Sequence, residues 1–255
     1  RRRDAVLRSL LVRVLVVFPT LAAAVAAGPS ARAADRTVLA VAACDSYADL
    51  KKQLGWLGNQ IDNPGLAGML ESILLLATQG RGLAGLDVKR PLGAVVTSDG
   101  ADLAVHGFVP VKDLDRLLSS LQGVTGPVET DGDVRRIVLP SGLPLEITAR
   151  DGWAVIAPGG MPGAAVDPTA VLDAVAKTYT LGIETFPGRM SDAVRERIEA
   201  AIDQTAAVSA AQGQPVDADA LKAGLASLRQ TESLALGLRS EEHTSELQSR
   251  VDISY

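Results

Sequence analysis

The sequence predicts an α+β fold in which an antiparallel sheet, made of hairpins and a meander, carries amphipathic helices packed on one face. Two short apolar runs, residues 92–97 and 102–109, flank Ser98-Asp99-Gly100, whose Asp and Gly are typical of a hairpin turn. A helical leucine pattern follows directly, and further short strands are separated by turn residues. Because neither a hairpin nor an amphipathic helix can bury its apolar face alone, we expect them to pack together.

The helix predicted over residues 113–121 has the clearest pattern. Asp113 is a good N-cap, and Leu114, Leu117, Leu118 and Leu121 recur behind it at i, i+3, i+4 and i+7. Pro110 cannot donate to a strand ladder and ends the strand before it. Gly123 predicts the end of the helix.

The elements around this unit follow from the same signals. Residues 37–44 predict a first strand, and two helices follow it with leucines at helical spacing. Residues 134–139, 143–149 and 153–157 predict a meander, because Asp151-Gly152 is a strong two-residue turn. The stretch over residues 158–163 is rich in Pro and Gly and predicts a linker.

A second module is predicted after the linker. A helix begins at Asp167-Pro168, residues 180–186 form a strand, and Ser191 and Asp217 each cap a helix. Residues 233–238 predict a strand that is cut off. Strand 180–186 and the helix behind it echo strand 102–109 and helix 113–121, which we interpret as a weak internal repeat whose second copy is truncated.

The first 33 residues have the pattern of a secretory signal peptide. Five arginines within the first 13 residues precede an apolar run over residues 14–28, and Ala31-Arg32-Ala33 is a small-residue cleavage site. The alternative is a transmembrane anchor, but the run is shorter than the roughly 20 residues that span a bilayer. No later segment is apolar and long enough to cross one. We therefore expect an exported protein of the periplasm, the cell surface or the extracellular space.

Cys44, the single cysteine, is open to three interpretations. Val41-Ala42-Ala43-Cys44 is similar to a lipobox, which would make the chain a lipoprotein. A lipobox directly follows the apolar run, whereas Asp35 and Arg36 intervene here. A reactive thiol would need a basic neighbour to lower its pKa. The favoured interpretation is a buried thiol at the end of the first strand.

The C-terminal residues resemble a translated sequencing adapter. Residues 239–249 match the in-frame translation, residues 250–252 cover a variable index, and residues 253–255 match the constant stretch behind it. We interpret 239–255 as an artefactual tail and expect it to be disordered or at most a frayed helix. Strand 233–238 should then be poorly paired at one edge, and His243 should carry no function.

The net charge of −5 at pH 7 argues against nucleic acid and anionic membranes as partners. The predicted organisation is a signal peptide (1–33), an α+β domain (34–158), a second, truncated α+β module (164–238) and the tail (239–255).

Several motifs suggest chemistry, but each has a simpler structural interpretation. Residues 80–85 satisfy G-x-G-x-x-G, yet a helix precedes them where dinucleotide binding needs a strand, so they predict a connector. Asp131-Gly132-Asp133 offers too few oxygen ligands for calcium and predicts a turn. Trp56 and Trp153 could line a glycan or peptide groove, but core anchors are the favoured interpretation. His106 has no carboxylate placed to orient it, and we predict a partly exposed strand residue beside Phe108.

One family resemblance supports this picture. Residues 103–121, with Pro110-Val111-Lys112-Asp113 between strand and helix, resemble modules of large exported bacterial proteins classed as domains of unknown function. Residues 85–93 and Asp151-Gly152-Trp153-Ala154 fit the same pattern, so the resemblance covers most of residues 37–238. It implies export and repeated α+β modules, and it transfers no catalytic residue.

The sequence therefore favours a non-enzymatic exported protein with a binding or structural role, whose partner is an envelope protein or a glycan. We assign no catalytic, cofactor-binding or metal-binding residue. The alternative is a hydrolase that uses carboxylates such as Asp87, Asp99 or Asp102. An enzyme should show converging polar residues, whereas the aspartates of this chain lie mostly at caps and turns.

Overall fold

A computed structural model describes residues 36–60, 65–139, 142–161, 166–211, 213, 216–241 and 244–253. The strands are β1 (Thr37–Cys44), β2 (Leu92–Ser98), β3 (Leu103–Pro110), β4 (Glu129–Asp131), β5 (Val134–Val138), β6 (Pro144–Arg150), β7 (Trp153–Pro158), β8 (Leu181–Thr185), β9 (Thr231–Glu241) and β10 (Thr244–Ile253). The helices are α2 (Tyr47–Gln60), α3 (Leu66–Ala77), α4 (Leu114–Thr125), α5 (Pro168–Ala176), α6 (Asp192–Ala211) and α7 (Ala218–Ser227), with short 3₁₀ helices η2 (Pro187–Arg189) and η3 (Leu228–Gln230).

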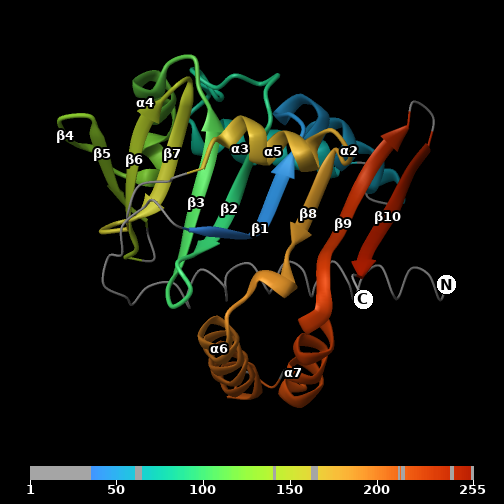
Figure 1. The fold of residues 1–255 in the computed structure, drawn as a ribbon. Coiled ribbons are helices and arrows are strands. Elements are labelled where there is room, and N and C mark those ends of the chain that lie inside the picture. The colour runs from blue at the N-terminus through green and yellow to red at the C-terminus, as the bar shows by residue number, and fades with distance from the viewer. Residues whose placement is uncertain are drawn as a thin grey trace.

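The described strands form one sheet with the order β10-β9-β8-β1-β2-β3-β7-β6-β5-β4 (Figure 1). Each neighbouring pair is antiparallel. The predicted α+β class is therefore confirmed, as are the hairpin β2–β3 and the meander β5–β6–β7. Strand β1 pairs with β8, with Ala42 opposite Ile183, so residues 34–158 and 164–238 contribute to the same sheet.

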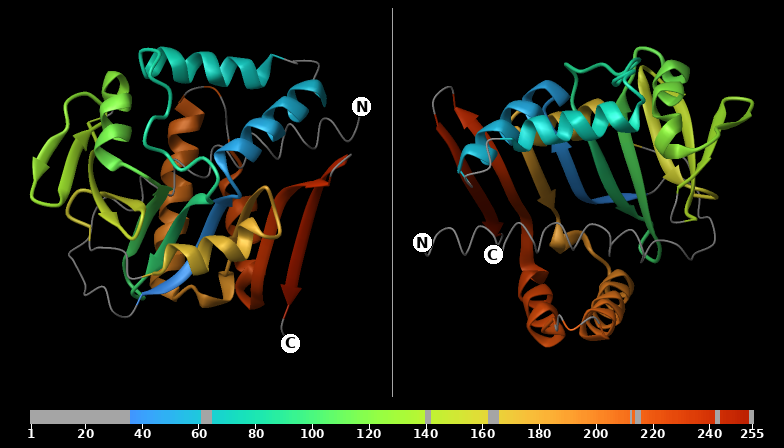
Figure 2. Two further views of the ribbon diagram at one scale, coloured as in Figure 1. Left: turned by 90° about the horizontal axis from the view of Figure 1, so that it is seen from above. Right: turned by 180° about the vertical axis from the view of Figure 1, so that it is seen from behind.

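Helices cover both faces of this sheet, which corrects the expectation of one covered face (Figure 2). Successive side chains of a strand point to opposite faces. Trp153 and Val155 of β7 share a buried cluster with Leu172 of α5, whereas Ala154 between them shares a cluster with Leu117 of α4. The hairpin pattern predicted one buried face, but strands near the centre of a large sheet can be covered on both.

Helix α5 lies close against the strands because glycines make room for it. A Cβ on Gly182 of β8 would lie 2.8 Å from Cδ2 of Tyr179 and 2.9 Å from Cγ1 of Val175. A Cβ on Gly237 of β9 would meet the Tyr179 ring as well. Side chains at these positions would therefore push α5 and Tyr179 off the sheet.

Helices α6 and α7 project beyond one end of the sheet, while α2 and α3 lie towards the other (Figures 1 and 2). The start of α6 is anchored, because Val194 packs with Leu39, Val96 and Leu103. Ser191 Oγ accepts from the Val194 amide at 3.2 Å and donates to the Gly100 carbonyl at 2.6 Å. The predicted Ser191 cap therefore also ties α6 to the β2–β3 turn.

The internal repeat differs from the predicted one. A strand, a helix pair and a hairpin occur as β1, α2, α3, β2, β3 and again as β8, α6, α7, β9, β10. The strand β8 therefore corresponds in topology to β1, where the sequence pattern had matched it to β3. Strands β1 and β3 are each followed by a helix, as β8 is. Only the order of strands in the sheet shows that β8 corresponds to β1.

One element boundary and one additional strand also differ from expectation. Helix α4 passes through Gly123 and ends at Thr125, and its C-cap Gly126 has a φ of 72°, in the left-handed region that glycine adopts without steric cost. Strand β4 was not predicted; it follows this helix and pairs with β5.

The expectation of a disordered tail is wrong. Strand β9 extends to Glu241, and β10 pairs with it from Thr244 opposite Glu241 to Ile253 opposite Thr231. Strand β9 is paired on both edges, with β8 and with β10. The prediction looked for a helical stripe, whereas Leu247, Val251 and Ile253 are spaced by even numbers of residues, which is the period of a strand.

The predicted signal peptide, residues 1–33, lies outside the described residues. Among the residues that the structure does describe, no helix combines the length and apolar character needed to cross a membrane.

Candidate functional site

The carboxylates proposed for a hydrolase do not converge. Asp99 lies in the β2–β3 turn, where Oδ1 accepts from the amides of Ala101 at 3.1 Å and Asp102 at 2.8 Å. Its Oδ2 accepts from Nη2 of Arg36 at 2.8 Å. The hydrogen bond from the Asp102 amide is the largest of the effects that lower the pKa of Asp99. Asp99 therefore stays ionised and holds the turn.

Asp102 and Asp87 are held by separate cations. Asp102 Oδ1 lies 2.5 Å from Nη1 of Arg197, so this pair joins the turn to α6. The Asp87 amide donates to the Pro110 carbonyl, and its carboxylate lies 3.9 Å from Nζ of Lys112. Pro110 ends β3 whereas Asp102 precedes its start, a separation of roughly 26 Å along the strand. The structure thus brings Asp99 and Asp102 together and keeps Asp87 apart.

His106 is buried, which corrects the prediction of a partly exposed residue. Its exposed fraction is 1%, and its ring lies 6.5 Å from that of Phe108 in a stacked arrangement. It faces the same side of the sheet as its register partner Val95, which is fully buried. The pattern of alternation could not reveal this, because both faces of β3 are covered.

Cys44 is a buried thiol at the end of β1, as predicted. Its Sγ donates to the Ser46 carbonyl at 3.3 Å. Burial raises the pKa of the thiol to about 11, and the hydrogen bond to Ser46 only partly opposes that rise. A thiol in this state is a poor nucleophile near neutral pH.

The remaining motifs have structural roles. Trp153 is 2% exposed and meets Phe108 edge to face with ring centroids 6.4 Å apart, which confirms it as a core anchor, whereas Trp56 on α2 is half-buried. The connector over residues 80–85 is tied to the start of α4, because the Gly85 carbonyl accepts from the amides of Lys112 and Asp113. Asp131-Gly132-Asp133 is the turn between β4 and β5. The described residues contain no cluster of three metal-ligating side chains.

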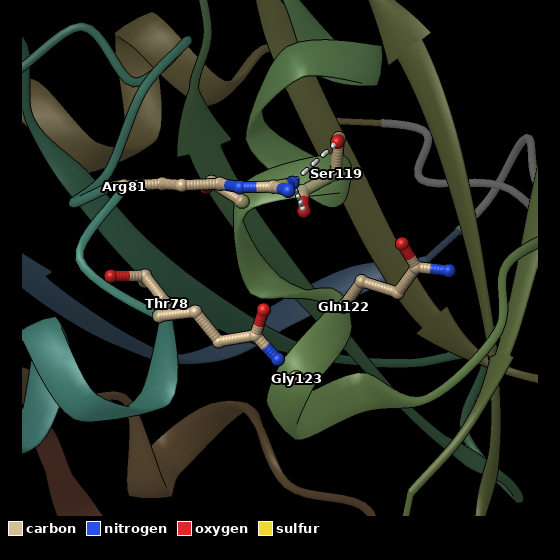
Figure 3. Close-up of a pocket in the computed structure, with 7 residues that line it drawn as sticks. Thr78, Arg81, Ser119, Gln122 and Gly123 are labelled. Carbon is tan, nitrogen blue, oxygen red and sulfur yellow. Dashed lines mark hydrogen bonds between the residues drawn. The ribbon is translucent and has the colours of Figure 1, made fainter.

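A polar hollow lies between the end of α3, the connector behind it and α4 (Figure 3). It encloses about 130 Å³ and is lined by Thr78, Gln79, Arg81, Ser119, Ser120, Gln122 and Gly123. Arg81 reaches across it, and its Nη1 donates to the carbonyl and to Oγ of Ser119 at 3.3 and 3.4 Å. The lining offers a guanidinium, two side-chain amides and hydroxyl groups, which suits a polar or anionic group.

Apolar side chains project from α3, the helix that ends at this hollow. Met69, Leu75 and Leu76 are 55%, 51% and 82% exposed, and we call these three residues the α3 stripe. On another side of the helix, Glu71 forms an ion pair with Lys51 of α2, which ties the two helices together. The α3 stripe is thus an apolar surface on a helix that is held in place elsewhere.

Sequence reasoning assigned no role to this region. It predicted here only a helix with leucines at helical spacing, and Met69 on that helix is more than half exposed. Leu74-Leu75-Leu76 was the available signal, because three consecutive leucines cannot all share one face of a helix. Arg81 lay inside a motif that had been interpreted only as a connector.

Searches against protein-family models, curated proteins and solved structures found no match to this chain.

Proposed function

We propose that this chain is an exported, non-enzymatic binding domain of the bacterial cell envelope. The observation that carries the proposal is the α3 stripe, three large apolar side chains exposed beside a polar hollow. Exposed apolar surface rimmed by polar groups is characteristic of interaction sites. Membership of the exported family with repeated α+β modules, suggested by residues 103–121, agrees with this role.

The alternative hydrolase has weaker support. Asp99 has a lowered pKa and stays ionised, so it is poorly suited to donate a proton as a general acid. Asp102 is paired with Arg197, and Asp87 lies at the other end of β3. These aspartates stabilise turns and join elements, which accounts for them without a reaction.

Export is supported by the arginine-rich start, the apolar run and the cleavage site within residues 1–33. We expect N-terminal sequencing of secreted protein to begin at Ala34. A start at Cys44 with a bound lipid would establish the lipoprotein alternative instead. Retention of the full chain in the cytoplasm would contradict export altogether.

Binding is tested by photo-crosslinking in producing cells. A photoreactive phenylalanine analogue at position 76 should give adducts with an envelope component. The same analogue at position 208, where Val208 on α6 is 53% exposed, is the control and should give none. Equal labelling at both positions, or no adduct at position 76, would contradict a binding role for α3.

A further inference from the structure

We propose that the α3 stripe and the adjoining hollow bind a peptide segment in which a carboxylate lies next to an apolar side chain. The inference rests on the proposed binding function and specifies its partner. The carboxylate would enter the hollow at Arg81, and the apolar side chain would cover Leu75 and Leu76.

The charge of the hollow favours a carboxylate. Arg81 is the one charged residue among the seven that line it. Both hydrogen bonds to Ser119 use Nη1, and they leave Nε and Nη2 for a ligand. A guanidinium binds a carboxylate through two parallel hydrogen bonds, and the amides of Gln79 and Gln122 supply further donors.

The hollow is pre-formed by local hydrogen bonds. Thr78 is 1% exposed; its Oγ1 donates to the Leu74 carbonyl at 2.7 Å and accepts from the Gly82 amide at 2.9 Å. The Gly80 amide donates to the Leu75 carbonyl at 2.6 Å, which closes the end of α3. A ligand would therefore have little backbone to order on this side, which favours binding.

The size of the hollow limits what enters it. A volume of about 130 Å³ admits a carboxylate or a group of similar size. The rest of a larger ligand would lie outside, and Leu75 and Leu76 stand in the last turn of α3, directly before Thr78 and Gln79 of the lining. From Met69 to Leu76 the α3 stripe extends about 10 Å, the length of three extended residues.

The same features favour a peptide over other partners. A glycan could place an acid in the hollow, but its hydroxyl groups would gain little against three large apolar side chains. An anionic lipid surface would be repelled by a net charge of −5. A peptide offers a carboxylate and an apolar side chain within a few ångströms.

The test is selection of peptides by the full-length protein from a random dodecapeptide phage library, followed by fluorescence polarisation with the selected peptides. We expect Asp, Glu or a free C-terminus next to Leu, Ile or Phe. Arg81→Gln and Leu76→Ser should each weaken binding at least about tenfold, the loss expected for a charged hydrogen bond or a buried Leu. Lys177→Gln at the C-cap of α5 and Val208→Ser on α6 are the matched controls and should change it less than twofold.

Selected peptides without an acidic residue, or binding that neither Arg81→Gln nor Leu76→Ser weakens, would overturn the inference. So would the absence of selected peptides together with Arg81-dependent binding to purified peptidoglycan or to phosphatidylglycerol vesicles. Circular dichroism melts of each variant show whether a loss reflects unfolding. If position 76 gives crosslinks but no peptide is selected, this inference alone is contradicted. If position 76 gives no crosslinks, the proposed function is contradicted.

Discussion

The two topological repeats have the same order of strands and helices, but their side chains pack differently. In the first, β1, β2 and β3 lie near the centre of the sheet, and Phe108 and Val95 are fully buried. In the second, β8, β9 and β10 reach an edge, and α7 contains no buried residue. Helix α4, which directly follows the first repeat, by contrast contributes Leu117 and Leu118 to a core cluster.

The difference shows what fixes the topology. Hydrogen-bonded pairing positions the strands in both repeats, whereas tight side-chain packing is concentrated in the first. Local stability should therefore differ between the repeats, because buried apolar area and not backbone pairing supplies most of the stabilisation. The first repeat should resist local opening, and the helices of the second should open before the sheet does.

The largest effect expected is that of Leu117→Ala in α4, the helix that directly follows the first repeat. Leu117 of α4 is 5% exposed, so its truncation should lower the free energy of unfolding by about 2–5 kcal/mol. Leu221→Ala on α7 is the matched variant, and because Leu221 is 44% exposed it should cost less than about 0.5 kcal/mol. Urea unfolding followed by circular dichroism measures both. Equal losses would contradict the difference in burial between α4, which covers the first repeat's hairpin, and α7 of the second repeat.

A smaller effect concerns Cys44, which ends β1 and stands opposite Leu181 of β8. Its pKa is raised by burial from the ordinary 9.0 to about 11, so the folded state favours the neutral thiol. That contribution to stability is fully present below pH 9 and is lost as the pH rises towards 11. Chemical unfolding between pH 8 and 11 should show this loss, and Cys44→Ala should remove that part of the pH dependence. The same slope in both proteins would contradict the assignment.

Helix caps and tight turns were predictable from the sequence, because the residues that form them have few other structural roles. Asp113, Asp167 and Asp217 cap their helices as expected, because a carboxylate before an apolar helical pattern has few other roles. Asp151-Gly152 makes its turn with φ values of 50° and 76°, as expected of that pair.

Other features depended on tertiary contacts. His106 lies on a strand face whose burial depends on distant elements, so local alternation could not predict its 1% exposure. The order of strands from two repeats in one sheet is a long-range property as well. The hollow at Arg81 needs the end of α3 next to α4, and no spacing along the chain reveals that contact.

The N-caps of α4 and α7 allow the stability of these two helices to be compared directly. Asp113 Oδ1 accepts from the Arg116 amide at 2.9 Å, and Asp217 Oδ1 accepts from the Ala220 amide at the same distance. Asp113→Ala should cost about 1 kcal/mol of global stability, the usual loss for an N-cap. Asp217→Ala should cost clearly less, because α7 can unfold locally. Urea melts measure the global loss, and hydrogen exchange should show faster exchange in α7 alone for Asp217→Ala. Slower or unchanged exchange there would contradict local opening.

The smallest effect expected is that of deleting residues 244–255, which removes β10 from the edge of the second repeat. Strand β10 adds backbone hydrogen bonds to β9 but brings only Leu247, Val251 and Ile253 as apolar residues. The net gain of such bonds is modest, and ordering ten residues opposes it. We therefore expect the melting temperature to fall by less than about 2 °C, which corresponds to roughly 0.5–1 kcal/mol for a domain of this size. Scanning calorimetry of the full and the shortened chain measures the shift. A fall comparable to that of Leu117→Ala would show that the second repeat depends on its edge strand as strongly as the fold depends on the packing of α4. It would also count against the interpretation of residues 239–255 as an artefactual tail.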